Sequence, residues 1–454
     1  MFRRPLPEWR RSDTIGRCQQ GAKGAIVVPT PPFPGVRRWE SMSVAAVLLT
    51  AVALALPCPS RAEGAASCAV VPEEKIDVAD AGALADAISG AKCGRALILA
   101  AGRYDQDTEI TKDCPASAPL LITARDPQSA VLSGKLKLAG DHLVVSGFRI
   151  DGGRIEMMGQ DNRVTRNLFL PGGGLIIRGA GGRIDHNEFR PASGNGIDVA
   201  LKLSRGDRRP AAGNLIDYNL FHSADAPALR GARQDDEDED DGHRPSVALY
   251  LGQFSARQGR GDMLAYGNVG TVVEHNLFLD VARRRSVHIK SNGNEIRANT
   301  FIASPGVRRA GQITVRSGQN NEIAGNYVSG DIRMLLFEED NRAIGNVLVD
   351  GAQLVVMAGG GEMTQYDGPQ QRPAVHSLIA GNQGILRIGE AAARRQNKAP
   401  AEGTVVEGHQ GPIEKDLETH TTIRDKTSIS LPKVQALTAA EVGLAAPDPR
   451  CPGA

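Results

Sequence analysis

The sequence predicts an all-β protein, a right-handed parallel β-helix whose N-terminal edge is closed by a short capping helix. Three observations favour this fold. A short motif with a fixed Asn recurs along most of the chain, a second short apolar strand accompanies most copies, and the composition is rich in turn formers, with 52 Gly, 26 Pro and only 4% aromatic residues. A chain of 454 residues can bury a large core, and this composition is not typical of a helical bundle or a membrane protein.

The recurring motif starts with Asn, Gly or Asp, passes through an apolar residue to a second Asn, and often ends in Phe. Its copies are NRVTRNLF (162–169), GRIDHNEF (182–189), NLIDYNLF (214–221), TVVEHNLF (271–278), NEIRANTF (294–301), NEIAGNYV (321–328), NRAIGNVL (341–348), the degenerate HSLIAGNQ (376–383) and the earlier relative DHLVVSGF (141–148). Most copies follow one another after about 20 to 27 residues, a period typical of a solenoid whose coils bury their apolar faces against each other. Stacked Asn side chains would bond along the coils, so their predicted role is structural.

A second short strand lies one turn before many of these motifs. These strands are GLIIRG (174–179), GIDVA (196–200), VALYLG (247–252), SVHIK (286–290), QITVR (312–316), DIRML (331–335) and QLVVM (353–357). Several short strands in each coil favour a β-helix over a propeller, which needs longer and more even blades. The segment Ala79–Gly94 has helical spacing and is predicted to cap the open N-terminal edge.

The N-terminal segment has the pattern of an export signal. Residues 1–41 lack periodicity and form an N-terminal extension of uncertain status, with Met42 as an alternative start. Residues 42–62 carry a short apolar run after two arginines and end in small residues, which is typical of a secretory signal peptide cleaved near Ala62. A membrane anchor is the alternative. The interpretation is a periplasmic or secreted protein, with no membrane contact once the signal is removed.

The remainder, residues 63–454, is predicted to be a single β-helix domain that becomes irregular after about residue 391. Four cysteines in an exported chain indicate two disulfides, and Cys93–Cys114 with Cys68–Cys451 is the favoured one of three pairings. Seven acidic residues between Gln234 and Gly242 indicate a solvated loop. The net charge of +1 argues neither for nucleic acid nor for a membrane surface, so no nucleic acid partner is expected, and the oligomeric state stays open.

Alternation along three successive strands separates an apolar inner face from a cationic outer face. Successive side chains in a strand point to opposite sides, so Val287 is predicted to point inward and His288 and Lys290 outward. Adjacent coils stack about 4.8 Å apart, which would bring equivalent residues into a column. The predicted cationic column consists of Lys290, Arg316 and Arg333, with Arg283 and Arg285 at its edge. Such a column favours an extended polyanion as the partner.

Cleavage of a uronic-acid polysaccharide by β-elimination requires this kind of chemistry. The carboxylate at C5 must be neutralised, a base must take the C5 proton, and an acid must protect the departing O4 oxygen. A lysine can be the base if neighbouring cations or burial lower its pKa from about 10.4. No pair of carboxylates stands out, which argues against a glycoside hydrolase.

The stretch SVHIKSNGNEIRANTF (286–301), followed by GQITVRSGQNNEIAGNYVSGDIRM (311–334), resembles polysaccharide lyase family 6, the group of chondroitinase B and alginate lyases. The resemblance extends in organisation over about residues 70–390, and its specific part is the pattern KS-x-x-N-x-x-x-x-N-T-F. It implies a parallel β-helix in which Lys290 is the base and Arg316 the acid. His288 and Arg333 are expected to contact the substrate.

The sequence departs from this family where its members hold calcium. The family pattern Glu-x-Glu before the lysine is replaced by Arg283 and Arg285, and a third ligand would fall near Gln253. Guanidinium groups cannot ligate calcium, so the resemblance implies no metal cofactor here. Two alternatives follow. Arg283 or Arg285 replaces the metal in a calcium-independent lyase, with alginate as the favoured substrate and dermatan or chondroitin sulfate as the alternative, or the protein binds a polyuronate without cleaving it.

Overall fold

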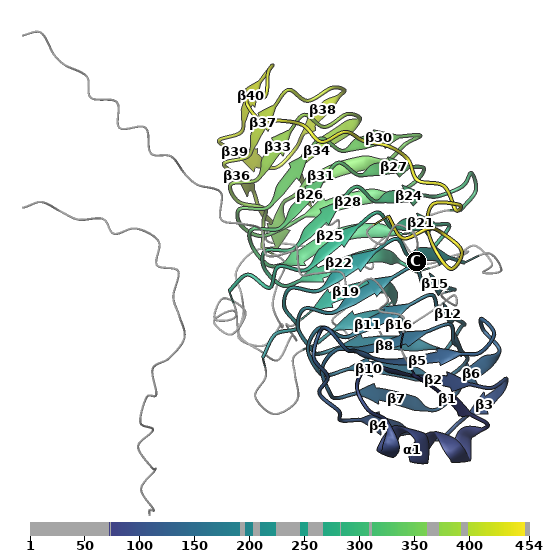
Figure 1. The fold of residues 1–454 in the computed structure, drawn as a ribbon. Helices are drawn as coiled ribbons and strands as arrows, with labels where there is room; N and C mark the ends of the chain where they lie inside the picture. Colours follow the sequence, from purple (N-terminus) through teal and green to yellow (C-terminus); the bar gives the residue numbers. More distant parts are fainter. Residues whose placement is uncertain are drawn as a thin grey trace, which may run out of the picture. The chain divides into compact units, whose positions relative to one another are not determined.

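The chain folds into stacked coils whose strands form long parallel sheets, as the repeat predicts (Figure 1). The structure, a computed structural model, describes residues 72, 74–190, 196–202, 209–223, 246–252, 267–281, 283–307, 311–360, 372–391 and 398–449. Three sheets of 14, 12 and 10 strands, here called sheets A, C and B, account for nearly all of the strands. This arrangement is a parallel β-helix.

The central coils each contribute one strand to each sheet in the order A, B, C, whereas sheet B ends at β30 (Val347–Val349) and, of these three sheets, the later coils add strands to A and C only. Sheet A contains β1 (Glu74–Val78), β2 (Arg95–Leu99), β5 (Leu120–Ala124), β8 (Leu143–Ser146), β11 (Arg163–Thr165), β14 (Arg183–Asp185), β17 (Leu215–Asp217), β20 (Val272–Glu274), β23 (Glu295–Arg297), β26 (Glu322–Ala324), β29 (Arg342–Ile344), β33 (Leu378–Ala380), β37 (Val405–Glu407) and β40 (Thr422–Arg424). Sheet B contains β3 (Gly102–Tyr104), β6 (Ala130–Leu132), β9 (Arg149–Ile150), β12 (Leu168–Phe169), β15 (Glu188–Phe189), β18 (Leu220–His222), β21 (Leu277–Leu279), β24 (Thr300–Ile302), β27 (Tyr327–Ser329) and β30 (Val347–Val349).

Sheet C carries the predicted site. It contains β4 (Thr108–Ile110), β7 (Lys135–Leu138), β10 (Arg154–Met157), β13 (Gly174–Ile177), β16 (Gly196–Leu201), β19 (Ser246–Gly252), β22 (Arg285–Lys290), β25 (Gln312–Ser317), β28 (Arg333–Leu336), β31 (Gln353–Met357), β34 (Ile385–Glu390) and β38 (Ile413–Lys415). Two small pairs complete the strands, β32 (Gly359–Gly360) with β35 (Lys398–Ala399) and β36 (Ala401–Glu402) with β39 (Glu418–Thr419).

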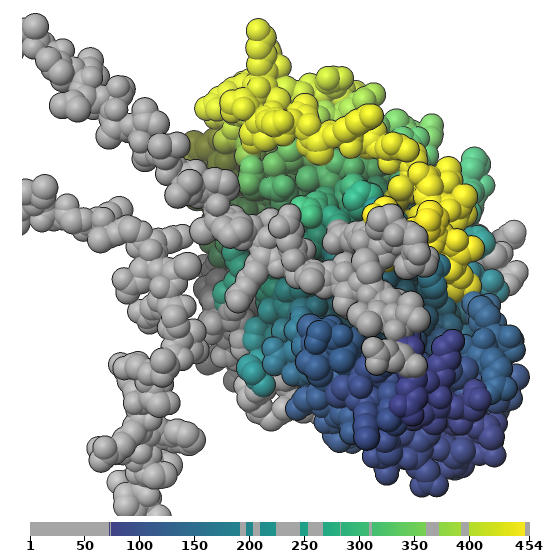
Figure 2. Space-filling model, viewed as in Figure 1, coloured from purple at the N-terminus to yellow at the C-terminus, as the bar shows by residue number. Residues whose placement is uncertain are grey.

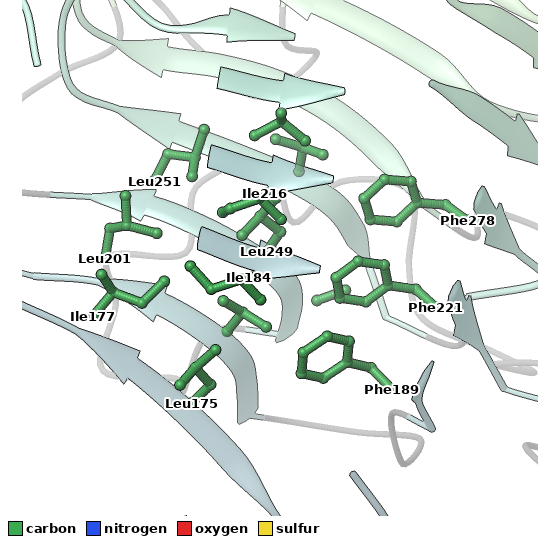
Figure 3. Close-up of a cluster of buried hydrophobic side chains, with 14 of the residues drawn as sticks. Leu175, Ile177, Ile184, Phe189, Leu201, Ile216, Phe221, Leu249, Leu251 and Phe278 are labelled. Carbon is green, nitrogen blue, oxygen red and sulfur yellow. The ribbon is translucent and has the colours of Figure 1, made fainter. Parts of the chain in front are cut away.

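The interior of the coils is filled by apolar side chains that repeat from rung to rung. The motif phenylalanines stack in a file, with ring centroids 4.5 to 4.7 Å apart between Phe169, Phe189, Phe221, Phe278 and Phe301. Figure 3 shows Phe189, Phe221 and Phe278 of this file opposite leucines and isoleucines of the other sheets. Stacking of equivalent residues lets each coil bury an apolar face that it could not bury alone.

The motif asparagines form the predicted ladder at the turn from sheet A to sheet B. Each side chain inside the ladder accepts from the amide of the Asn one coil before and donates to the oxygen of the Asn one coil after, whereas the first and last members bond to an Asn on one side only. The members are Asn167, Asn187, Asn219, Asn276, Asn299, Asn326, Asn346 and Asn382. The first Asn of several motifs forms a second ladder, in which Asn294, Asn321 and Asn341 bond in turn. The structural role predicted for the motif asparagines is therefore confirmed.

The N-terminal edge is covered by helix α1 (Ala81–Gly90), which lies inside the predicted capping segment. Asp80 starts the helix by accepting a hydrogen bond from the amide of Ala83. Close by, the disulfide Cys93–Cys114 joins two residues of the first coils, so this predicted pairing is confirmed.

Regular coils continue past residue 391, because β37 and β40 extend sheet A and β38 extends sheet C. The strand-free part begins after Arg424. The segment 427–449 then runs back over the coils, where Asp448 contacts Arg163 and Arg183 of the early coils (Figures 1 and 2). This segment joins parts of the chain that are far apart in sequence.

Several predictions concern residues outside the described ranges. They are the extension 1–41, the signal segment 42–62, the pair Cys68–Cys451 and the acidic run after Gln234. Among the residues that the structure does describe, no helix is both long enough and apolar enough to cross a membrane.

Candidate functional site

The candidate site lies on the outer face of sheet C, at the ends of β22 and β25. Val287 and Ile289 join the apolar core, as do Ile313 and Val315 of the next strand. The alternating side chains His288, Lys290, Thr314 and Arg316 therefore belong to the opposite face, as predicted. They are nevertheless almost completely buried, with Lys290 only 8% and Arg316 only 6% exposed. These charges lie in surroundings with little water, where electrostatic interactions are strong.

A β-bulge interrupts the pairing of β22 with β25 at Lys290. The strands keep one register from the pair Val287–Ile313 to the pair Ile289–Val315, and then Lys290 lies opposite Ser317 instead of Arg316. One extra residue of β25 thus faces Lys290, so Arg316 and Ser317 share that position. Bulges of this kind re-aim a side chain and are common beside active sites.

His288 lies among the cations of the site. Burial lowers the pKa of His288 well below 6.5, and the charges of Arg285, Lys290, Arg316 and Arg284 lower it further. Neither ring nitrogen of His288 has a hydrogen-bond partner among the described residues. The imidazole is therefore neutral at neutral pH and able to bond to a ligand.

An aromatic ring adjoins this group. Tyr250 of β19 lies opposite His288 in the sheet, and the two rings meet edge to face with centroids 5.5 Å apart. Tyr250 was not among the site residues predicted from the sequence. Its position in VALYLG, two residues before a glycine and on the outer face of the strand, could have identified it.

Arg283 is engaged by a carboxylate from two coils earlier. Its Nε and Nη2 donate to the two carboxylate oxygens of Asp198 at 3.1 and 2.7 Å, and both residues are buried. Burial raises the pKa of Asp198 although Arg283 opposes this effect. Asp198 was not predicted from the sequence, although an acidic residue inside the apolar strand GIDVA could have indicated it. The structure thus places the two edge arginines differently, with Arg283 on Asp198 and Arg285 near His288.

Arg333 does not lie in the predicted column. The neighbour of Arg316 is Phe337, the residue directly after β28, since Val315 pairs with Leu336. Arg333 lies at the other end of that strand, pairs with Gln353 and forms an ion pair with Glu390. The column therefore contains Lys290 and Arg316 but not Arg333. Gln253 lies outside the described residues.

The residues at the family's calcium position do not suit a calcium ion. Calcium takes six to eight oxygen ligands, whereas the described residues at this place are two arginines and one carboxylate that is already paired with Arg283. Within the described ranges, the one cluster of potential metal ligands is Asp185, His186 and Asp448, which lies beside sheet A and is neutralised by Arg163 and Arg183. We derive no chemical step through a metal.

The comparisons with known proteins agree on the architecture. No family model and no curated protein matches the chain. Among solved structures, the PL6 family polysaccharide lyase of Pseudopedobacter saltans matches 82% of this chain and 99% of its own, with 17% identity and a TM-score of 0.58. The fold is that of the family 6 polysaccharide lyases.

Two further structures share the family 6 fold. The alginate lyase AlyGC matches 78% of this chain with 19% identity and a TM-score of 0.57, and this chain spans about half of AlyGC, 52%. A mannuronic acid specific family 6 lyase from human gut microbiota matches 76% of this chain and 83% of its own, with 19% identity and a TM-score of 0.54. At such identities the likeness establishes the fold.

Proposed function

We propose that this protein is a polysaccharide lyase that cleaves a uronic-acid polymer by β-elimination, with alginate as the favoured substrate. The observation that carries the proposal is the buried group of Arg285, Lys290 and Arg316 around the neutral His288. Three cations and an unpartnered imidazole on one face can hold a uronate carboxylate beside both an amine and a guanidinium.

The proposed reaction uses Lys290 and Arg316 in sequence. The amine of Lys290 takes the C5 proton, and the electron pair of that bond forms the C4–C5 double bond. The C4–O4 bond breaks, its electron pair leaves with O4, and Arg316 supplies the proton that O4 needs. Solvent then restores both side chains. The first step requires the amine of Lys290 in its uncharged form.

Arg285 is the proposed substitute for a metal. The carboxylate on C5 must be neutralised before the proton can leave, and a guanidinium can do this with two parallel hydrogen bonds. Arg283, whose guanidinium binds Asp198, is the second candidate for this role. We therefore expect activity without calcium.

The solved structures with this fold support the substrate class. AlyGC and two further matches of TM-score above 0.5 are alginate lyases, and those two are described in complex with a trisaccharide and with G6. The disulfide Cys93–Cys114 supports a periplasmic or secreted location, because disulfides persist in oxidising compartments.

The test is to incubate the purified protein with alginate and with dermatan sulfate, each with and without a chelator. We expect ultraviolet absorbance from unsaturated uronate on alginate, unchanged by the chelator. Lys290→Ala should lower kcat by about 10²–10⁴-fold, the usual contribution of a positioned base. Lys135→Ala, which removes a lysine paired with Asp107 on the same sheet, is the matched control.

Two outcomes overturn the proposal. Full activity of Lys290→Ala removes the base assignment, and strict calcium dependence removes the role of Arg285. Tight binding of alginate without any unsaturated product would identify a polyuronate-binding protein instead.

A further inference from the structure

Basic residues recur just past the paired ends of the sheet C strands, on the N-terminal side of Lys290. Ile177, Leu201, Leu251 and Ile289 pair with one another in consecutive coils. The residues that follow them are Arg178, Lys202, Gly252 and Lys290. The register continues through this position, since the amide of Lys202 donates to the oxygen of Ile177 and Gly252 pairs with Lys290.

An aromatic ring fills the space beside the glycine of this row. A Cβ at Gly252 would lie 1.8 Å from Cε1 of Tyr250, so the Tyr250 ring covers the place where a side chain of residue 252 would be. Tyr250 is half-buried in a strand whose other residues are buried. An aromatic face between cations provides both an apolar surface for a sugar ring and partners for its carboxylates.

On the C-terminal side of Arg316 the residues of this row are no longer basic. The next two positions are Phe337 and Met357, which form an apolar cluster with Leu335 and Val355. The position after them is Glu390, a carboxylate. The row therefore favours a polyanion toward the N-terminal coils and disfavours one toward the C-terminal coils.

We propose that Lys202, Arg178 and the Tyr250 ring form additional binding subsites for a polyuronate chain that runs along the coils from Arg316 toward β13. The inference rests on the proposed function and adds a direction to it. The base acts on C5 of one sugar and the acid on the O4 that links it to the preceding sugar. The order from Lys290 to Arg316 thus points toward the non-reducing end, and the reducing-end sugars lie over Tyr250, Lys202 and Arg178.

The spacing agrees with this assignment. Strands are about 4.8 Å apart, so β13 to β25 covers about 19 Å, a distance that several linked pyranose rings can span. Arg178 and Lys202 are half-buried, so a ligand can reach them with modest loss of hydration.

The test compares Arg178→Ala and Lys202→Ala with wild type on oligouronates of increasing length. Each variant should raise KM for long oligomers about fivefold, the effect of one partly exposed ion pair, and leave KM for the shortest cleaved oligomer and kcat unchanged. Arg154→Ala is the matched control, because this exposed arginine lies on sheet C at the opposite end of its strand. Tyr250→Leu should raise KM for both short and long oligomers.

The outcomes separate this inference from the proposed function. If the wild type cleaves and Arg178→Ala and Lys202→Ala behave like Arg154→Ala, the subsites are wrong and the lyase stands. If the wild type does not cleave, the same oligomers are titrated into it calorimetrically. If the affinity of the wild type rises with oligomer length and both variants lose this rise, the binding subsites are supported although the protein is not a lyase. If neither variant changes the affinity, the binding subsites are wrong.

Discussion

The asparagine ladder and the group around His288 are both built from buried polar side chains, but their hydrogen bonding differs. Asn276 donates to the oxygens of Ile216, Glu274 and Asn299, and its own oxygen accepts from Asn219. His288 has a partner at neither nitrogen among the described residues, and cations surround it. Complete satisfaction is expected of a group that stabilises the fold.

This difference in hydrogen bonding separates a structural region, the asparagine ladder, from a functional one, the group around His288. A buried polar group without a partner lowers stability, so it persists where a ligand or a reaction uses it. The groups of Arg283 and Asp198 are paired, yet their burial also lowers stability. The pKa of Asp198 is raised in spite of its partner, so burial of this carboxylate outweighs the attraction of Arg283.

The largest expected effect on stability follows from breaking that ion pair. Asp198→Ala leaves the Arg283 guanidinium buried without its carboxylate, which should lower the free energy of unfolding by about 3–5 kcal/mol. Replacing both residues, as in Asp198→Leu with Arg283→Met, should restore most of the loss because neither position then holds a buried charge without its partner. Urea unfolding of the three proteins measures this. Equal stability of Asp198→Ala and wild type would show that the pair is not buried as described.

A smaller loss is expected from the ladder. Asn276→Ala removes donors and an acceptor from neighbours on both sides, and should lower the free energy of unfolding by about 1–3 kcal/mol. Asn382→Ala is the comparison, because Asn382 bonds to an Asn on one side only. Its loss should be smaller in the same urea titration. If the two variants lose equally, the bonds between asparagines add nothing to those with the backbone.

Local patterns were sufficient to predict the coils, and insufficient to predict which side chains meet across them. Alternation in SVHIK and QITVR placed Val287 and Val315 inside, and helical spacing located α1. The pattern within a strand does not specify register between coils, and the pairing of Val315 with Leu336 places Phe337 instead of Arg333 beside Arg316. Strand pairing with β16 was needed to bring Asp198 to Arg283 from 85 residues away.

The C-terminal segment is a second region whose contacts could not be predicted from local sequence patterns. It has no hydrophobic period, so its sequence predicts only irregular structure. Asp448 nevertheless ends beside Arg163, 285 residues earlier in the chain. Such contacts depend on tertiary charge pairing, which no local periodicity reports.

The smallest expected effect is the pH dependence contributed by His288. Since the pKa of His288 is lowered in the folded protein, the unfolded chain binds a proton below about pH 6.5 that the folded chain does not. Its contribution is absent above pH 6.5 and destabilises increasingly as the pH falls below it, by at most about 1.4 kcal/mol per pH unit. Urea unfolding at pH 7.5, 6.5 and 5.5 should show a shallower loss for His288→Asn than for wild type, with His420→Asn, whose side chain is exposed, as the control. Equal slopes for all three proteins would mean that His288 is protonated in the folded state, and the cations around it would then have to be balanced by an anion bound beside Lys290 and Arg316.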